Sequence, residues 1–310
     1  MERSLVFLAG VIVVVVAVAG VYFVLRAPVT PPPSSRLSVI ASFYPIYDFA
    51  KNVAGDRANV SVLVPETLDV HEFDPTPSDL QRVSSANVLI YSGAGLEPWV
   101  PSLVAAVNKP SLTVVDTSMG ITLLPVSQEF QRNNRTIDPH IWLDPIDAKK
   151  QVENIAKGLS AADPTNAQYY TSNAAAYEAK LDALNAEIVR NTTSTKTKLF
   201  ITFHEAFAYY AKRYNLTQIS IQGPFQEEPT PSDIQNIVNT INKYHLRYVG
   251  YESLENPAIP QAISGQTNAT LILMDPIEGL TPTDKAVGLD YISLLHMDTQ
   301  NIVKALDNVG

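Results

Sequence analysis

Short apolar runs alternate with predicted helices along most of the chain. Six runs have the length and the apolar content of buried strands, at 37–41, 59–63, 88–91, 198–202, 218–222 and 248–251. In each half, a helix is predicted after the first run and again before the third. Strands that alternate with helices of about ten to fifteen residues indicate βαβ units. The pattern therefore predicts an α/β fold with parallel sheets.

An internal repeat divides this pattern into two halves. The string Pro-Thr-Pro-Ser-Asp-Leu-Gln at 75–81 returns as Pro-Thr-Pro-Ser-Asp-Ile-Gln at 229–235. Locally each copy is a helix start, with Thr as the N-cap, Pro in the first turn and Asp near the positive end of the helix dipole. Two unrelated caps would explain the strings alone. The matching order of elements around them instead predicts two similar lobes.

Two helical segments lie between the halves, at 146–159 and 166–191, and Asp163-Pro164 separates them. The second has an apolar stripe at spacings of three or four, formed by Tyr170, Ala174, Tyr177, Leu181, Leu184 and Ile188. We expect this segment to be a stiff helix that joins the lobes. The predicted divisions are an N-terminal lobe at 37–163, a linker helix at 164–192 and a C-terminal lobe at 193–310.

The N-terminus carries an uncharged, Val-rich run at 5–25, followed by Arg26 and a Pro-rich stretch. A bilayer is spanned by about 20 apolar residues, whereas the core of a signal peptide is about 7–15 residues long. We therefore favour a transmembrane anchor at 1–26 over a cleaved signal segment, with an extended stalk at 27–36. This predicts a membrane-anchored protein at the cell surface, with its folded part outside the cytoplasm.

The amino-acid composition argues against several classes of partner and of metal site. The formal net charge of -9 and the pI near 5.0 argue against a nucleic-acid partner. The absence of cysteine excludes thiolate zinc sites, disulfides and a lipidated N-terminal cysteine. Five Asn-x-Ser/Thr sequons favour an extracytoplasmic glycoprotein, and they begin at Asn59, Asn134, Asn191, Asn215 and Asn268.

Three histidines and one aspartate are the candidate functional residues. His71 lies in Asp-Val-His-Glu-Phe-Asp-Pro, His140 in Asp-Pro-His-Ile-Trp-Leu-Asp-Pro and His204 in Thr-Phe-His-Glu-Ala-Phe. Asp275 follows the apolar run 270–274 directly. Ligands of open α/β sheets bind beyond the carboxyl ends of the strands, so all four residues are expected to face one crevice between the lobes. Three imidazoles and a carboxylate suit a divalent transition metal.

Each candidate also has a structural explanation. A single loop histidine is more often a surface residue than a ligand, and an Asp-Pro step is a common turn. The joint placement favours the metal site, with Glu72 and Glu205 as alternative or additional ligands. Other carboxylates are expected to orient the imidazoles through their second ring nitrogen, and the candidates are Asp69, Asp74, Asp138 and Asp144. His245 and His296 lack this placement and receive no role.

The sequence resembles a known family at these positions. The segment 39–48 (Val-Ile-Ala-Ser-Phe-Tyr-Pro-Ile-Tyr-Asp) and the motifs around His71 and His140 are similar to the cluster A-I metal-binding proteins of ABC transporters. This group includes ZnuA, TroA and PsaA. The resemblance runs from about residue 38 to the C-terminus. It implies two lobes joined by a long helix, a metal held between them by His71, His140, His204 and Asp275, and delivery of that metal to a permease.

The choice of metal depends on the third ligand position. Imidazole at His204 favours Zn²⁺, whereas a carboxylate there would favour Mn²⁺, and Fe²⁺ stays open as well. Zinc-specific members of the family often carry a His-rich loop before the second liganding histidine, but the segment 120–138 contains no histidine. The alternative function is a membrane-anchored, metal-dependent hydrolase. A fourth protein ligand would close the coordination sphere, and no His-Glu-x-x-His motif is present, so we expect no enzyme activity.

Overall fold

A four-stranded parallel sheet forms the core of the N-terminal half. The computed structural model describes residues 36–130 and 135–309, and residues 37–310 form one compact unit. The strands are β1 (Leu37–Ala41), β2 (Ala58–Val62), β3 (Val88–Tyr91) and β4 (Thr113–Asp116), in the order β2-β1-β3-β4. All three pairings are parallel, as the alternation of strands and helices predicts.

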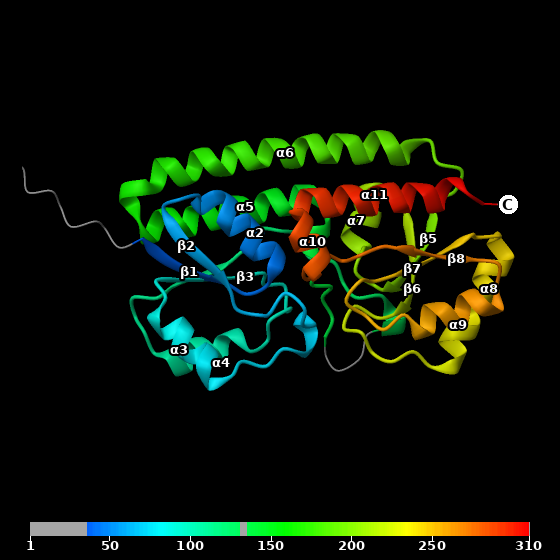
Figure 1. The fold of residues 1–310 in the computed structure, drawn as a ribbon, viewed down its shortest axis with the longest axis horizontal. Coiled ribbons are helices and arrows are strands. Elements are labelled where there is room, and N and C mark those ends of the chain that lie inside the picture. The colour runs from blue at the N-terminus through cyan, green and yellow to red at the C-terminus, as the bar shows by residue number, and fades with distance from the viewer. Residues whose placement is uncertain (1–35, 131–134, 310) are drawn as a thin grey trace, which may run out of the picture. The chain divides into compact units, whose positions relative to one another are not determined.

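Helices cover both faces of this sheet (Figure 1). They are α2 (Tyr44–Ala54), α3 (Pro77–Ser85), α4 (Val100–Val107) and α5 (Pro145–Ala162). Helix α2 has Pro45 in its first turn and ends at Gly55, whose φ of 53° is a left-handed conformation that glycine adopts without strain. Its buried face carries Phe49, whose ring packs edge-on against Tyr291 and at a tilt against Tyr177, from two other helices.

The C-terminal half contains two parallel pairs of strands. Strand β5 (Leu199–His204) pairs with β6 (Thr217–Gln222), and β7 (Tyr248–Tyr251) pairs with β8 (Thr270–Leu273). Strand β7 approaches β5 closely at Gly250, where a Cβ atom would lie 2.9 Å from the carbonyl oxygen of Ile201. The order β6-β5-β7-β8 thus repeats the order of the first sheet. The helices of this half are α7 (Ala208–Arg213), α8 (Pro231–Tyr244), α9 (Ala258–Gln266) and α10 (Pro282–Val287).

A long helix runs alongside both halves. Helix α6 (Ala167–Thr193) passes beside α5 and α11 (Tyr291–Asp307), as Figure 1 shows. Its buried side consists of the six apolar residues of the predicted stripe together with Thr192. Two polar contacts fix it to α2. The Tyr177 hydroxyl donates to Asp48 at 2.7 Å, and the Asn173 side-chain amide donates to the Val53 carbonyl at 3.1 Å.

The predicted elements agree with the structure to within a few residues at their ends, but several elements were not predicted. These are β4, α4, α9, α10 and α11. Within residues 36–130 and 135–309, no helix is long and apolar enough to cross a membrane. The predicted anchor, nearly all of the stalk and the sequon at Asn134 lie outside the described residues.

Both copies of the repeated string form the predicted helix starts, and each is a capping box. The Thr76 hydroxyl accepts from the Asp79 amide, and the Asp79 carboxylate accepts from the Thr76 amide at 3.0 Å. Thr230 and Asp233 make the same two bonds at the start of α8. Because a bonded N-cap satisfies amides that a helix start otherwise exposes, these residues stabilise the entry into each helix.

The capping box at α3 can be tested by substitution. We expect Thr76→Ala to lower the free energy of unfolding by about 1 kcal/mol, because the Asp79 amide loses its acceptor. Urea denaturation of the purified protein measures this change. Ser78→Ala is the matched control, since Ser78 is exposed and lies in the same turn without a capping bond. Equal stability of the two variants would contradict the assignment.

Candidate metal centre

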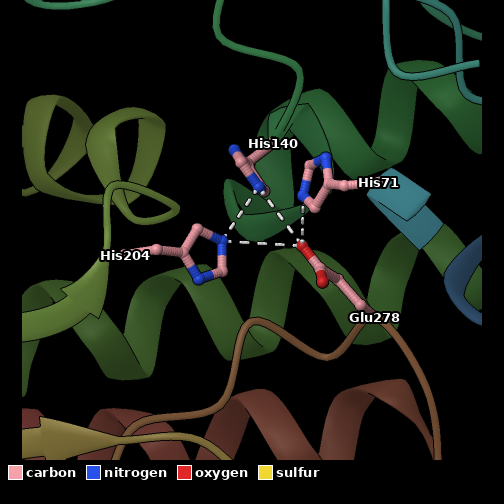
Figure 2. A group of neighbouring side chains, drawn as sticks. All are labelled: His71, His140, His204 and Glu278. Carbon is pink, nitrogen blue, oxygen red and sulfur yellow. Dashed lines mark hydrogen bonds and ion pairs between the residues drawn. The ribbon is translucent and has the colours of Figure 1, made fainter. Parts of the chain in front are cut away.

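Three imidazoles and one carboxylate meet in a buried cluster (Figure 2). Its members are His71, His140, His204 and Glu278, and their ligand atoms all lie within 4.8 Å of one another. The side chains of His140 and His204 are fully buried, that of His71 is 3% exposed and that of Glu278 is 7% exposed. Among the described residues, this is the one group of potential metal ligands with such spacing.

Four of the six separations between the ligand atoms are near those of a tetrahedral site. Oε1 of Glu278 lies 3.1 Å from Nε2 of His71, 3.2 Å from Nε2 of His140 and 3.6 Å from Nε2 of His204. The Nε2 atoms of His140 and His204 are 3.2 Å apart. Tetrahedral zinc with bonds of about 2.0–2.1 Å separates neighbouring ligand atoms by roughly 3.3 Å. These four separations are therefore close to those of a four-coordinate dication site, and the two between His71 and the other histidines are at most 4.8 Å.

A local turn positions His140. Oδ1 of Asp138 accepts from the His140 amide at 2.9 Å and from its Nδ1 at 2.8 Å. Pro139 disfavours the helical conformation at Asp138, which helps the carboxylate to fold back over the next residues. The imidazole thus donates through Nδ1, and Nε2 faces the cluster with its lone pair. Trp142 supports the ring from one side, with the ring centroids 5.1 Å apart.

A contact between strands positions His204, the last residue of β5. Oε1 of Glu252 accepts from the His204 amide at 3.2 Å and from Nδ1 at 2.7 Å. Glu252 directly follows β7, the strand that lies beside β5. One carboxylate oxygen therefore serves both the backbone and the ring of each histidine, in the same way at His140 and His204.

His71 is held differently. It lies in a short 3-10 helix (Val70–Glu72), and its amide donates to Asp69 at 2.7 Å. Its Nε2 faces Glu278, but its Nδ1 is buried without a hydrogen-bond partner among the described residues. A carboxylate outside the cluster therefore fixes the backbone of His71, but none holds its ring through Nδ1.

The segment after β8 brings Glu278 into the cluster. Ile277 has a φ of 61°, a costly conformation for a β-branched residue, and its amide donates to Oδ1 of Asp275 at 2.9 Å. Gly279 then passes so close to Glu66 that a Cβ atom would lie 2.0 Å from the Glu66 carbonyl oxygen. The Leu280 amide donates to that oxygen at 3.0 Å. These contacts tie the carboxylate to the loop that also carries His71.

The structure corrects the predicted fourth ligand. Asp275 does not join the cluster, because Oδ2 accepts from the amide and hydroxyl of Ser253 while Oδ1 accepts from Ile277. Its carboxylate closes the turn that delivers Glu278. Sequence reasoning missed Glu278, since it selected the acid directly at the strand end and not the one that follows the turn.

The other residues that the sequence suggested do not belong to the cluster, and most of them have other contacts. Asp138, one of the candidate orienting carboxylates, bonds the His140 ring, whereas Asp144 caps α5 through the Ile146 amide and pairs with Arg213 at 2.7 Å. The alternative ligands Glu72 and Glu205 are outside the cluster, and Glu205 accepts from Ser127. His245 caps the end of α8, and His296 pairs with Glu187.

Charge coupling sets the protonation of the cluster. Burial would raise the pKa of Glu278, but His71, His140 and His204 hold it well below the usual value. Burial would lower the pKa of His140, yet Asp138 and Glu278 raise it. The pKa of His204 is raised well above its usual value, because Glu252 and Glu278 outweigh burial. The cluster thus attracts positive charge, as a cation site requires.

Comparison with known proteins identifies the fold and its family. A model of the ZnuA family, described as the periplasmic component A of a zinc-uptake complex, matches residues 39–305. The chain belongs to the ZnuA family. ZnuA of Bacillus subtilis, a high-affinity zinc uptake protein, is 29% identical over 280 residues, which cover 87% of this chain and 88% of that protein.

Two further relatives are streptococcal. The zinc-binding lipoprotein AdcA of Streptococcus pneumoniae is 30% identical over 284 residues, or 89% of this chain, and this ZnuA-family chain spans 57% of the length of AdcA. The zinc-bound ZnuA-like domain of AdcA has a TM-score of 0.78 at 30% identity, over 88% of this chain and all of that domain.

The ligand set can be tested by paired substitutions. We expect His140→Ala and Glu278→Gln each to lower zinc affinity at least about tenfold, because each removes a ligand from a closed site. Asp275→Asn should change affinity much less, since Asp275 lies outside the cluster and the amide oxygen of Asn can still accept from Ile277 and keep the turn. Calorimetry on residues 36–310 measures the three affinities. A larger loss in Asp275→Asn than in Glu278→Gln would restore the ligand set predicted from the sequence.

Proposed function

We propose that this chain captures zinc outside the cytoplasm and delivers it to an ABC permease for uptake. His71, His140, His204 and Glu278 are the proposed ligands. One observation supports this most strongly: four ligand atoms from four distant segments of the chain lie within 4.8 Å of one another in a buried position. The ZnuA family provides independent support, because it is described as a component of a zinc-uptake complex.

Zinc is favoured over manganese and iron by the donor set. Three imidazole nitrogens and one carboxylate oxygen suit tetrahedral zinc, whereas manganese prefers more oxygen ligands and a larger coordination number. The relatives with zinc in their names, AdcA and the ZnuA of Bacillus subtilis, agree with this choice. The segment 120–138 has no histidine, so the proposed capture relies on the four cluster residues alone.

The proposed function is transport and not catalysis. A catalytic zinc keeps an open position for water, but here a fourth protein ligand completes the coordination sphere. The acids that could serve such a hydrolase as a base are Glu72 and Glu205. Both lie outside the cluster, and Glu205 accepts from Ser127. The family is likewise described by its role in an uptake complex. These observations favour a binding protein over the alternative hydrolase.

The arrangement of the chain around the site remains part of the proposal. We infer an N-terminal lobe at 37–163, a linker helix at 164–192 and a C-terminal lobe at 193–310, with the metal between the lobes. An anchor at 1–26 and a stalk at 27–36 would hold this unit at the cell surface. Glycosylation is supported by the exposure of all four described sequon asparagines, which are Asn59, Asn191, Asn215 and Asn268.

Metal analysis tests the function directly. We expect protein purified without added metal, then offered equal zinc and manganese, to hold about one zinc per chain, because the donor set favours nitrogen-rich tetrahedral coordination. Mass spectrometry of the metal content after gel filtration measures the ratio. Predominant manganese would contradict the choice of metal. Retention of neither metal would contradict the function itself.

Zinc affinity should fall on acidification. Protons compete with zinc for Nε2 of His140 and His204, and both histidines have raised pKa values in the metal-free protein. Zinc affinity should therefore begin to fall at a pH above the ordinary imidazole pKa of about 6.5. Below that point it should decrease about tenfold per pH unit for each proton that zinc displaces. Competition with a chelator from about pH 8 to about pH 5.5 measures it. Glu252→Gln should shift the fall to lower pH, and an affinity independent of pH would contradict the site.

A further inference from the structure

His71 differs from the other two histidines in how its ring is held. The rings of His140 and His204 each donate from Nδ1 to a buried carboxylate, at 2.8 and 2.7 Å. Nδ1 of His71 has no such partner among the described residues, although the side chain is only 3% exposed. Rotation of this ring is therefore limited by packing and by its contact with Glu278, and not by a second hydrogen bond.

An aromatic side chain packs against His71. The ring of Phe225 meets the His71 ring at a centroid distance of 6.0 Å and an angle of 89°. Edge-to-face contacts of this kind are favourable beyond the area that they bury. Phe225 belongs to the loop after β6, whereas His71 belongs to the loop after β2, so the contact joins the two halves of the chain.

A tight turn holds Phe225 in this place. The Gln226 amide donates to the Gly223 carbonyl at 3.1 Å, with Pro224 and Phe225 between them. Proline sets the backbone at its preferred turn position, and Gln226 continues with a φ of 54°. A Cβ atom on Gly223 would lie 2.9 Å from Phe130, so the base of the turn is closely packed. The guanidinium of Arg135 lies 4.5 Å from the centroid of the Phe225 ring.

The internal repeat relates these two residues. His71 precedes the string that starts at Pro75 by the same interval by which Phe225 precedes the string that starts at Pro229. The equivalent loop of each half thus reaches the cluster, one with a ligand and the other with an apolar ring. This symmetry explains why the two side chains approach each other.

We propose that Phe225 is a positioning residue that fixes the ring of His71 and slows release of the metal. This inference rests on the proposed zinc-binding function. Carboxylates bonded to Nδ1 orient His140 and His204, whereas His71 is oriented by its edge-to-face contact with Phe225 together with its contact with Glu278. Without the Phe225 ring, His71 can rotate away from the cluster and water can reach its second nitrogen. The effect should appear in dissociation, because Phe225 does not coordinate and carries no charge that attracts the incoming cation.

Zinc release from a set of variants tests the proposal. Excess chelator is mixed with the zinc-loaded protein in a stopped-flow instrument, and zinc uptake by the metal-free protein is measured separately. Phe225→Ala should release zinc roughly 3- to 10-fold faster, the range expected for one aromatic contact, with little change in uptake rate. Phe225→Leu should recover part of the effect. Tyr244→Ala, which removes an exposed ring from α8, is the control and should match the unmodified protein.

A double-mutant cycle separates positioning from a general structural role. If Phe225 acts through His71, then Phe225→Ala should have no further effect on release in a His71→Ala background. Cobalt spectra of the loaded single variant should also show altered intensity, because the ligand geometry changes. Unchanged release in Phe225→Ala, or an equal acceleration with and without His71, would overturn the proposal. Failure of the unmodified protein to bind zinc would instead overturn the proposed function.

Discussion

A carboxylate buried among three imidazoles is the constraint on which this structure depends. Removing the charge of Glu278 from water is costly unless partners compensate for the lost hydration. The partners are His71, His140 and His204, and each comes from a different segment of the chain. The charge is stabilised only when all these segments are in place together. A dication at their centre would interact favourably with all four ligand atoms at once. The arrangement therefore suits a metal-binding site better than a purely structural role in the core.

The backbone supplies the precision that this cluster needs. Asp138 reaches His140 because a short turn folds its carboxylate over the next two residues. Glu252 reaches His204 because β7 lies beside β5, and Gly250 permits that close approach. Each carboxylate bonds both the ring and the amide of its histidine, so ring orientation is coupled directly to backbone position. Such outer partners fix the tautomer of a metal-binding histidine as well as its direction.

Much of the fold could be predicted from the sequence, whereas the full ligand set could not. Strand and helix periodicity located most elements, and the repeated cap at Thr76 and Thr230 marked equivalent helices. The three histidines could be predicted because they lie near strand ends or in distinctive motifs. Glu278 could not, since its arrival depends on a left-handed backbone at Ile277, which no periodicity signals. Glu252 follows β7 directly, so the rule that ligands bind beyond strand ends could have found it.

The internal repeat shows how similar halves come to supply dissimilar chemistry. The shared strand order and the shared capping boxes are scaffold features, and a third Thr-Pro-x-Asp box starts α10 at Thr281, so the cap by itself marks a helix start and not a site. What differs is the loop that precedes the cap. In the N-terminal half it carries a histidine, and in the C-terminal half it carries Phe225 at the equivalent position. A histidine of the cluster and an apolar ring thus meet at positions that the repeat relates, with their ring centroids 6.0 Å apart. The other two histidines, His140 and His204, come from segments outside these two loops, so the repeat alone does not build the cluster.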